Sequence, residues 1–198
     1  LISGRSNFSF ILWGPLGTGK TTIARIAACV TKNEFHEISA VNSGVGDIRK
    51  IIDQAKKTWR SSKRRSTLFI DEIHRFNKSQ QDAVLPYVEN GSIRLIGSTT
   101  ENPSFEVIPA LRSRCQIFRL ESLSPKDLRC LLERGLVDKR RGLGNESLEI
   151  NSDAKDLIIN YANGDARKVF NVLEAACDYL YSKEIKSHPI SVLDIQGI

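Results

Sequence analysis

Short runs of apolar residues alternate with helix-like stripes over the first 120 residues of the chain. The apolar runs predict buried strands, and they cover residues 9–13, 35–39, 67–71, 93–97 and 116–120. The segments between them predict helices over 20–31, from 45 to about 59 and over 79–89. Strands that alternate with helices favour an α/β fold, with a five-stranded parallel sheet covered by helices on both faces.

Two of the predicted helices indicate which side should face the core. In the first, apolar residues recur at helical spacing, at Ile23, Ile26, Ala27 and Val30. In the second, steps of three and four residues fall on Val45, Ile48, Ile52, Ala55 and Trp59. Because residues three and four apart share one face of a helix, each stripe is expected to pack inward.

After about residue 120 the pattern changes to helices alone. Ser124-Pro125-Lys126-Asp127 predicts a helix start, with Ser124 as N-cap, proline in the first helical position and an acid in the first turn. Leu128, Leu131 and Leu132 are expected to face a core. Ser152 is expected to cap the next helix, whose apolar residues are Leu157, Ile158 and Tyr161. A last long helix carries Val169, Phe170, Leu173, Cys177 and Leu180. We therefore predict an α/β nucleotide-binding domain over 1–120 and a small helical domain over 121–198.

A phosphate-binding pattern lies between the first predicted strand and the first predicted helix. Gly14-Pro15-Leu16-Gly17-Thr18-Gly19-Lys20-Thr21 matches G-x-x-x-x-G-K-[ST]. Glycines let the backbone curl round phosphates without a Cβ clash, and loop N–H groups at a helix N-terminus attract the anion. Lys20 should reach the β- and γ-phosphates of ATP, and the Thr21 hydroxyl should ligate Mg²⁺.

Two acids end the third predicted strand, after Leu68-Phe69-Ile70. The carboxyl ends of parallel strands meet at one edge of a sheet, so Asp71 and Glu72 should lie beside the phosphate-binding loop. Asp71 is expected to hold Mg²⁺ through water. Glu72 is then available to orient and activate the attacking water as a general base.

Other candidates follow the later strands. Ser98-Thr99-Thr100-Glu101-Asn102 could supply a hydroxyl or amide to the γ-phosphate, although such a segment is also typical of a turn. Arg112 and Arg114 precede the fifth strand, where an exposed arginine could reach a neighbour's γ-phosphate. Arg167 begins the last long helix, where a surface ion pair is the alternative. His74 has no second histidine near it, which favours a structural role over metal binding.

Composition and charge narrow the class of protein. The 198 residues carry a formal net charge of +6, which is compatible with a nucleic-acid partner. The clusters at 63–65 and 139–141 are basic, and each is typical of a solvated loop as well as of a phosphate-binding surface.

No apolar run is long enough to span a membrane. The four cysteines form no CxxC pair, which favours free thiols, and Cys29 and Cys177 are expected in the core. The chain has no methionine, so we expect a fragment that lacks its original N-terminus.

Taken together, these residues resemble the AAA+ ATPases of the clamp-loader clade. The string Phe69-Ile70-Asp71-Glu72-Ile73-His74-Arg75-Phe76-Asn77-Lys78-Ser79-Gln80-Gln81-Asp82 is similar to the signature of the replication-associated recombination protein A family. The eukaryotic Werner-helicase-interacting ATPase is a relative in the same family. The segment 97–105 matches this branch too, and the resemblance extends over about residues 8–180.

The resemblance implies roles at the nucleotide. The Walker A loop would comprise Gly14, Pro15, Leu16, Gly17, Thr18, Gly19, Lys20, Thr21 and Thr22. Asp71 and Thr21 would serve Mg²⁺, and Glu72 would serve the lytic water. Leu16 stands where the family usually has proline, and we expect a modest effect because position 16 is not a phosphate-contacting glycine.

It also implies roles further along the chain. Thr100 would be sensor 1, with Thr99 as the near alternative. Arg114 would be an arginine finger that acts in trans within an oligomer. Arg167 would be sensor 2, contacting the γ-phosphate from the helical lid.

The family implies partners and a place of action. Its members act on DNA at stalled replication forks, have DNA-stimulated ATPase activity and, in bacteria, associate with single-strand-binding protein. They assemble into tetramers through a C-terminal helical domain, which we expect to lie outside this chain. The segments 39–45 and 138–144 favour a bacterial member in the cytoplasm, at the nucleoid, with the nucleus as the eukaryotic alternative.

Three other functions stay open at this point. A branch-migration motor of the RuvB type and a clamp-loader subunit share the phosphate-binding loop and the Ser-Arg finger, although neither is expected to carry the run 74–82. A scaffold that binds ATP without hydrolysing it is the third, and Glu72 argues against it because a scaffold needs no base for water.

Overall fold

The computed structural model describes residues 8–146, 148–182 and 189–197. They form two compact units. The first contains the described residues up to Gly14 and Gly19–Leu120, and the second contains Pro15–Thr18 and the described residues from Glu121 onward. No described helix is both long enough and apolar enough to cross a membrane. The assignment of these units as a nucleotide-binding domain and a lid domain remains a prediction.

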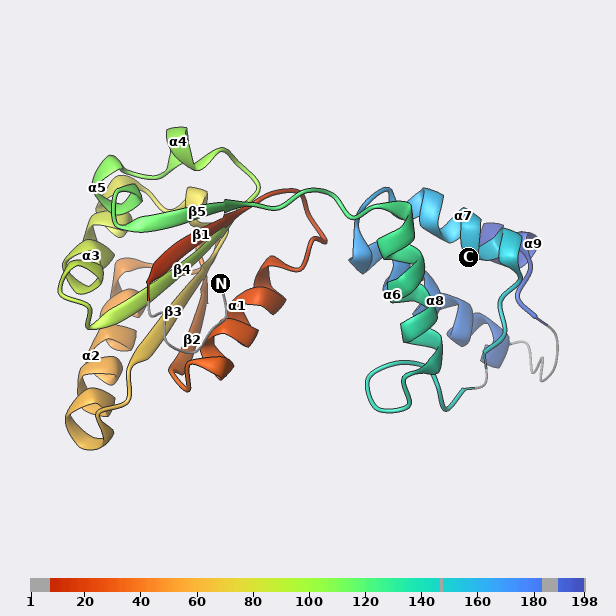
Figure 1. Ribbon diagram of the computed structural model, residues 1–198, viewed down its shortest axis with the longest axis horizontal. Helices are drawn as coiled ribbons and strands as arrows, with labels where there is room; N and C mark the ends of the chain where they lie inside the picture. Colours follow the sequence, from red (N-terminus) through yellow and green to blue (C-terminus); the bar gives the residue numbers. More distant parts are fainter. Residues whose placement is uncertain (1–7, 147, 183–188, 198) are drawn as a thin grey trace. The chain divides into compact units, whose positions relative to one another are not determined.

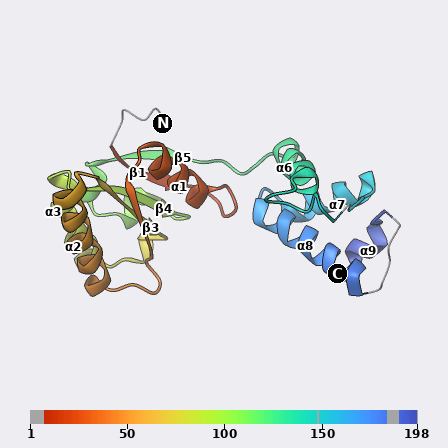
Figure 2. The same cartoon turned by 90° about the horizontal axis from the view of Figure 1, so that it is seen from below.

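The first unit is an α/β sandwich with a five-stranded parallel sheet (Figures 1 and 2). Its strands are β1 (Ser9–Trp13), β2 (Glu34–Ser39), β3 (Ser66–Asp71), β4 (Ile93–Thr99) and β5 (Cys115–Arg119). Its helical segments are α1 (Lys20–Val30), α2 (Val45–Ser62), η1 (Ile73–Arg75), α3 (Lys78–Glu89), α4 (Pro103–Glu106) and α5 (Pro109–Arg112). The strand order is β2-β3-β4-β1-β5, and all four pairings are parallel. The predicted fold class is therefore confirmed.

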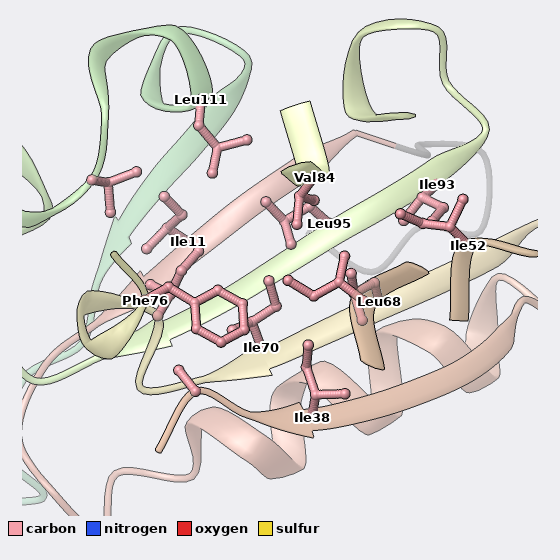
Figure 3. Close-up of a cluster of buried hydrophobic side chains, with 14 of the residues drawn as sticks. Ile11, Ile38, Ile52, Leu68, Ile70, Phe76, Val84, Ile93, Leu95 and Leu111 are labelled. Atoms are coloured by element: carbon pink, nitrogen blue, oxygen red, sulfur yellow. The ribbon is translucent and has the colours of Figure 1, made fainter. Parts of the chain in front are cut away.

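Alternate residues of each inner strand supply two separate cores. Ile11, Leu68, Ile70 and Leu95 point to the face covered by α2 and α3, where Figure 3 shows them with Ile52 and Val84. Phe10, Leu12, Phe69 and Ile96 point to the opposite face, against Ala24 and Ala27 of α1. This period of two explains why the strands are apolar throughout, since both faces are buried.

The buried side of α1 differs in part from the predicted one, since Ala27 is buried and Ile23 packs against the core as predicted but Ile26 and Val30 do not. Ala24, Ala27 and Ala28 are buried, whereas Ile26 and Val30 are 45% and 43% exposed. Small alanines allow the helix to approach the sheet closely, so the contact face is rotated away from the larger residues. Cys29, predicted to be in the core, is exposed for the same reason. The stripe of α2 is confirmed for Ile48, Ile52 and Ala55, but Trp59 is 45% exposed near the end of that helix.

The second unit is helical. It comprises α6 (Pro125–Val137), α7 (Ser152–Ala162), α8 (Ala166–Ser182) and α9 (Val192–Gln196). Leu128, Leu132, Ile158 and Leu173 belong to its core. The predicted start of α6 is confirmed, because Ser124 and Asp127 form a reciprocal capping box after which Pro125 is the first helical residue.

Some details of this unit correct the sequence analysis. The N-cap of α7 is Asn151, and Ser152 is its first helical residue. Tyr161 is 61% exposed and Phe170 is 38% exposed, because each lies on the outer side of its helix. Cys177 is buried, as predicted. The side chain of Leu180 lies outside the described residues.

Candidate nucleotide site

Three strand ends meet at the carboxyl edge of the sheet. In the register, Trp13 at the end of β1 pairs with Thr99 at the end of β4, and Ile70 of β3 pairs with Gly97 of β4. The backbone N–H of Gly14 donates to the carbonyl of Thr99 at 3.1 Å. The phosphate-binding loop therefore starts beside the segments that carry Asp71 and Thr99, which is where α/β sheets bind ligands.

The loop has the backbone that its glycines permit. Gly17 and Gly19 have φ values of +69° and +83°, which residues with a Cβ rarely adopt. A Cβ at Gly14 would collide with the carbonyl oxygen of Leu120, and one at Gly17 would collide with Asp165. Leu16 is 53% exposed and is not one of the loop residues with a positive φ.

Helix α1 begins at Lys20 with an N-terminus that no side chain caps. Gly19 is the N-cap residue and supplies no side-chain hydrogen bond. The N–H groups of a first helical turn have no partner inside the helix, and the helix dipole makes them attractive to an anion. Thr21 and Thr22 lie in this turn, while the Thr18 hydroxyl donates to the carbonyl of Pro15 at 2.9 Å.

Lys20 is held beside the loop that it is predicted to serve. Its ammonium group donates to the carbonyl of Gly14 at 2.8 Å, and the residue is only 7% exposed. A buried ammonium that donates to a loop carbonyl is a point charge suited to a phosphate. The glycine backbone, the uncapped helix and Lys20 together fit the triphosphate of ATP.

The two acids at the end of β3, Asp71 and Glu72, are joined by Ser98 of β4. The Ser98 hydroxyl donates to Asp71 Oδ1 and lies 3.4 Å from the backbone N–H of Glu72, whose hydrogen it accepts. Ser98 itself is fully buried. An Asp carboxylate and the Thr21 hydroxyl are hard oxygen donors of the kind that Mg²⁺ selects, so these residues fit that ion.

Glu72 has a strained backbone and an unsatisfied carboxylate oxygen. Its φ and ψ of 54° and 50° are left-handed, which is uncommon for a residue with a Cβ. Oε2 is buried and has no hydrogen-bond partner among the described residues. It lies 3.2 Å from His74 Nδ1 without forming a hydrogen bond to it. A buried acceptor without a donor is suited to receive a proton from water.

The hydroxyls of Thr99 and Thr100 are placed differently. Thr99 is fully buried, and its hydroxyl oxygen lies 3.0 Å from His74 Nδ1 and 2.9 Å from the N–H of Glu101, which donates to it. Thr100 follows the end of β4 and is half-buried. The assignment of Thr100 as sensor 1 remains a prediction.

Arg114 lies at the amino ends of the strands, opposite the carboxyl edge where the phosphate-binding loop starts. It precedes Cys115, which pairs with Ser9 at the start of β1, whereas the loop follows Trp13 at the end of β1. Four residue steps along a strand span roughly 13 Å. Arg114 donates to the carbonyl of Ala110 at 2.8 Å and forms an ion pair with Glu89.

Arg167 and the basic clusters are held by local contacts. Arg167 is exposed in the first turn of α8, where its backbone N–H donates to Asp165 Oδ1 at 2.8 Å. Arg64 donates to the carbonyls of Lys32 and Asn33 at 2.7 and 3.1 Å, so it stabilises the turn after α1. Arg140 is held through its backbone N–H, which donates to the carboxylate of Asp138 at 2.8 Å.

Sequence comparison defines the class of protein. The family described as ATPase family associated with various cellular activities (AAA) matches residues 10–123. The chain therefore belongs to the AAA family of ATPases.

Individual relatives narrow this class. Replication-associated recombination protein A of Escherichia coli strain K12 is 48% identical over 170 residues, which cover 86% of this chain and 38% of that protein. ATPase WRNIP1 of Dictyostelium discoideum is 48% identical over 168 residues, covering 85% of this chain and 19% of that protein. This chain thus spans less than half of these relatives. Their similarity confirms the resemblance inferred from the motifs.

Solved structures agree with the fold. The RuvB Holliday junction branch migration motor of Thermotoga maritima matches with a TM-score of 0.75 and 27% identity. The match covers 96% of this chain and 60% of that one.

Proposed function

We propose that the full protein containing this chain is a DNA-stimulated ATPase that acts at stalled replication forks in DNA replication, recombination and repair. The observation that carries the hydrolytic part is the buried Oε2 of Glu72, which has no hydrogen-bond partner among the described residues. Glu72 directly follows Asp71, the last residue of β3. Membership of the AAA family and 48% identity to replication-associated recombination protein A support the biological setting.

In this proposal, each residue of the site has its own role in hydrolysis. The loop amides and Lys20 bind the β- and γ-phosphates, and Thr21 and Asp71 would hold Mg²⁺, which neutralises phosphate charge when bound. Glu72 accepts a proton from the attacking water as the water oxygen forms a bond to the γ-phosphorus. The bond from that phosphorus to the bridging oxygen breaks, and ADP and inorganic phosphate result. Thr100 donates a hydrogen bond to the γ-phosphate.

Oligomer contacts complete the proposal. Arg114 lies at the sheet edge away from its own loop, which supports a role at the γ-phosphate of a neighbouring subunit. Arg167 serves as sensor 2 from the helical lid. We further propose a homotetramer, single-strand-binding protein and single-stranded or forked DNA as partners, and the bacterial cytoplasm as the compartment, with the nucleus for a eukaryotic source.

The structural likeness to RuvB supports branch migration as a second candidate. The run from His74 to Asp82 and the identity to replication-associated recombination protein A favour the first. A scaffold that binds ATP without turnover is the third, and it has no use for Glu72.

One assay separates these functions. Steady-state ATPase rates of the full-length protein are measured at fixed salt with single-stranded, duplex, forked and four-way-junction DNA, alongside Glu72→Gln. Stimulation by ends or forks that Glu72→Gln abolishes is the expected result. Stimulation only by four-way junctions would favour the motor. An ATP-binding protein whose rate ignores DNA and equals that of Glu72→Gln would be a scaffold.

A further inference from the structure

A contact between three side chains joins the ends of β3 and β4. His74 lies in η1, immediately after the segment that holds Glu72. Its Nδ1 is 3.0 Å from Thr99 Oγ1 and 3.2 Å from Glu72 Oε2. The His74 side chain is only 11% exposed. One ring nitrogen therefore faces both a hydroxyl of one strand end and the carboxylate of the other.

The hydrogen-bond pattern assigns the proton on this ring. The Thr99 hydroxyl donates its own hydrogen to the carbonyl of Glu101 at 3.2 Å and accepts from the N–H of Glu101. We assign a hydrogen to His74 Nδ1, because a bare lone pair on Nδ1 would face the Glu72 carboxylate at 3.2 Å, and Thr99 Oγ1 then accepts from the ring. That hydrogen also faces Glu72 Oε2, which it attracts without completing a hydrogen bond.

Thr99 is itself tied to the phosphate-binding loop. Its carbonyl accepts the N–H of Gly14 at 3.1 Å, and it pairs with Trp13 in the sheet register. A continuous series of contacts thus runs from the first residue of the loop through Thr99 and His74 to Glu72. All of these residues belong to the first unit.

We propose that His74 is a positioning residue for hydrolysis, with Thr99 fixing its imidazole ring. The ring holds the Glu72 carboxylate in place and leaves Oε2 able to accept a hydrogen from the attacking water. The inference rests on the proposed role of Glu72 as the base. It assigns to His74 and Thr99 an effect on turnover that acts through Glu72 and requires no contact with ATP.

Conservative variants can separate positioning from simple packing. In His74→Asn the amide nitrogen lies near the place of Nδ1, whereas in His74→Gln the longer side chain displaces the donor. Thr99→Ser keeps the hydroxyl and Thr99→Val removes it. His36→Gln is the matched control, because His36 is also 11% exposed and adjoins Glu34, but it lies in the edge strand β2.

The test uses the full-length protein, with single-turnover ATP hydrolysis, ATP binding by calorimetry and thermal unfolding measured for each variant. We expect His74→Gln and Thr99→Val to lower the hydrolysis rate about 10–100-fold, as loss of an orienting partner does, with ATP affinity unchanged. His74→Asn and Thr99→Ser should recover most of the rate, and His36→Gln should match the wild type.

The background of Glu72→Gln supplies the decisive comparison. There His74→Gln should cause no further loss of rate, because the residue acts through the missing carboxylate. Equal losses in His74→Asn and His74→Gln that follow a fall in thermal stability would overturn the proposal in favour of packing, and so would a wild-type rate in His74→Gln. A wild-type rate in Glu72→Gln alone would instead refute the proposed role of Glu72.

Discussion

Arg114 forms an ion pair with Glu89 of α3, with 2.6 Å between its guanidinium nitrogen and the carboxylate. Both side chains are 41% exposed, so water weakens their attraction and the arginine can exchange partners. In the proposed oligomer, a γ-phosphate from a neighbour would be a stronger competitor for the guanidinium than Glu89.

This exchange predicts complementation between two inactive variants. Arg114→Ala should bind ATP normally in the oligomer but lose hydrolysis, since arginine fingers in trans contribute about 10³–10⁵-fold. Lys20→Ala should be inactive because it cannot bind ATP. Mixed oligomers should regain activity, since an Arg114→Ala subunit with ATP then adjoins an intact Arg114. The ATPase rate is measured across mixing ratios.

A flat, inactive mixing curve despite subunit exchange would contradict action in trans. If monomeric Arg114→Ala loses as much of the wild-type rate as the assembled variant does, that result would also contradict action in trans. Glu89→Gln should leave the assembled rate at or above that of the wild type, because it releases Arg114.

Lys20→Ala should also abolish ATP binding. The substitution removes the only positive charge that the sequence places within the loop motif, and with it the hydrogen bond to Gly14. Calorimetric titration with ATP provides the measurement. Lys57→Ala, at an exposed position on α2, is the control for charge. Normal ATP affinity in Lys20→Ala would mean that the loop is not the binding site.

Glu72 should reduce the stability of the protein while serving its activity. A left-handed residue with a Cβ costs about 1–2 kcal/mol, and a buried acceptor without a partner costs about 1–3 kcal/mol. Glu72→Gly removes both costs but adds about 0.5–1 kcal/mol of backbone entropy. We expect the free energy of unfolding to rise by roughly 1–4 kcal/mol, as measured by urea denaturation.

Lys32→Gly is the matched control for the backbone effect. Lys32 has a similar φ of 55° but is an exposed residue in the turn after α1. Its substitution reports the conformational term alone, and any extra gain in Glu72→Gly then belongs to the carboxylate. A loss of stability in Glu72→Gly would contradict the argument.

Cys115 predicts a loss of stability at high pH. Burial raises the pKa of its thiol from 9.0 to about 12 in the folded protein. Because the unfolded thiol releases its proton first, the stabilising effect is complete below pH 9 and is lost as pH rises from 9 to 12. The slope is at most about 1.4 kcal/mol per pH unit.

Urea unfolding at pH 8 and 10.5 tests this effect in wild type and Cys115→Ala. The wild type should lose more stability between the two pH values than the variant. Equal losses would show that Cys115 does not titrate on unfolding. Alkylation gives an independent readout, because the exposed Cys29 and Cys130 should react at pH 8 well before Cys115.

Local rules predicted the sheet well because its inner strands β1, β3 and β4 are buried on both faces and end in recognisable signals. The glycines of the loop and the Ser124 cap are further cases in which one residue type fits the conformation. The inward side of α1 was not predictable from hydrophobicity, since alanines gain by close approach and Ile26 stays outside.

The missed parts of the site depend on contacts between distant segments. A left-handed Glu72 is disfavoured locally and exists only because the surrounding sheet holds it. The approach of His74 to Thr99 follows from the β3–β4 register, which no local pattern contains. The short segments α4, α5 and η1 are too brief for a periodic signal.

The strand order has a consequence for synthesis on the ribosome. β1 emerges first, but both of its neighbours, β4 and β5, lie more than 75 residues later in the chain. A nascent chain that ends before residue 93 can pair β2 with β3 yet leaves β1 without either neighbour. The strand that precedes the phosphate-binding loop is therefore fixed late, and ATP can act as a folding ligand only once β4 and β5 have been made.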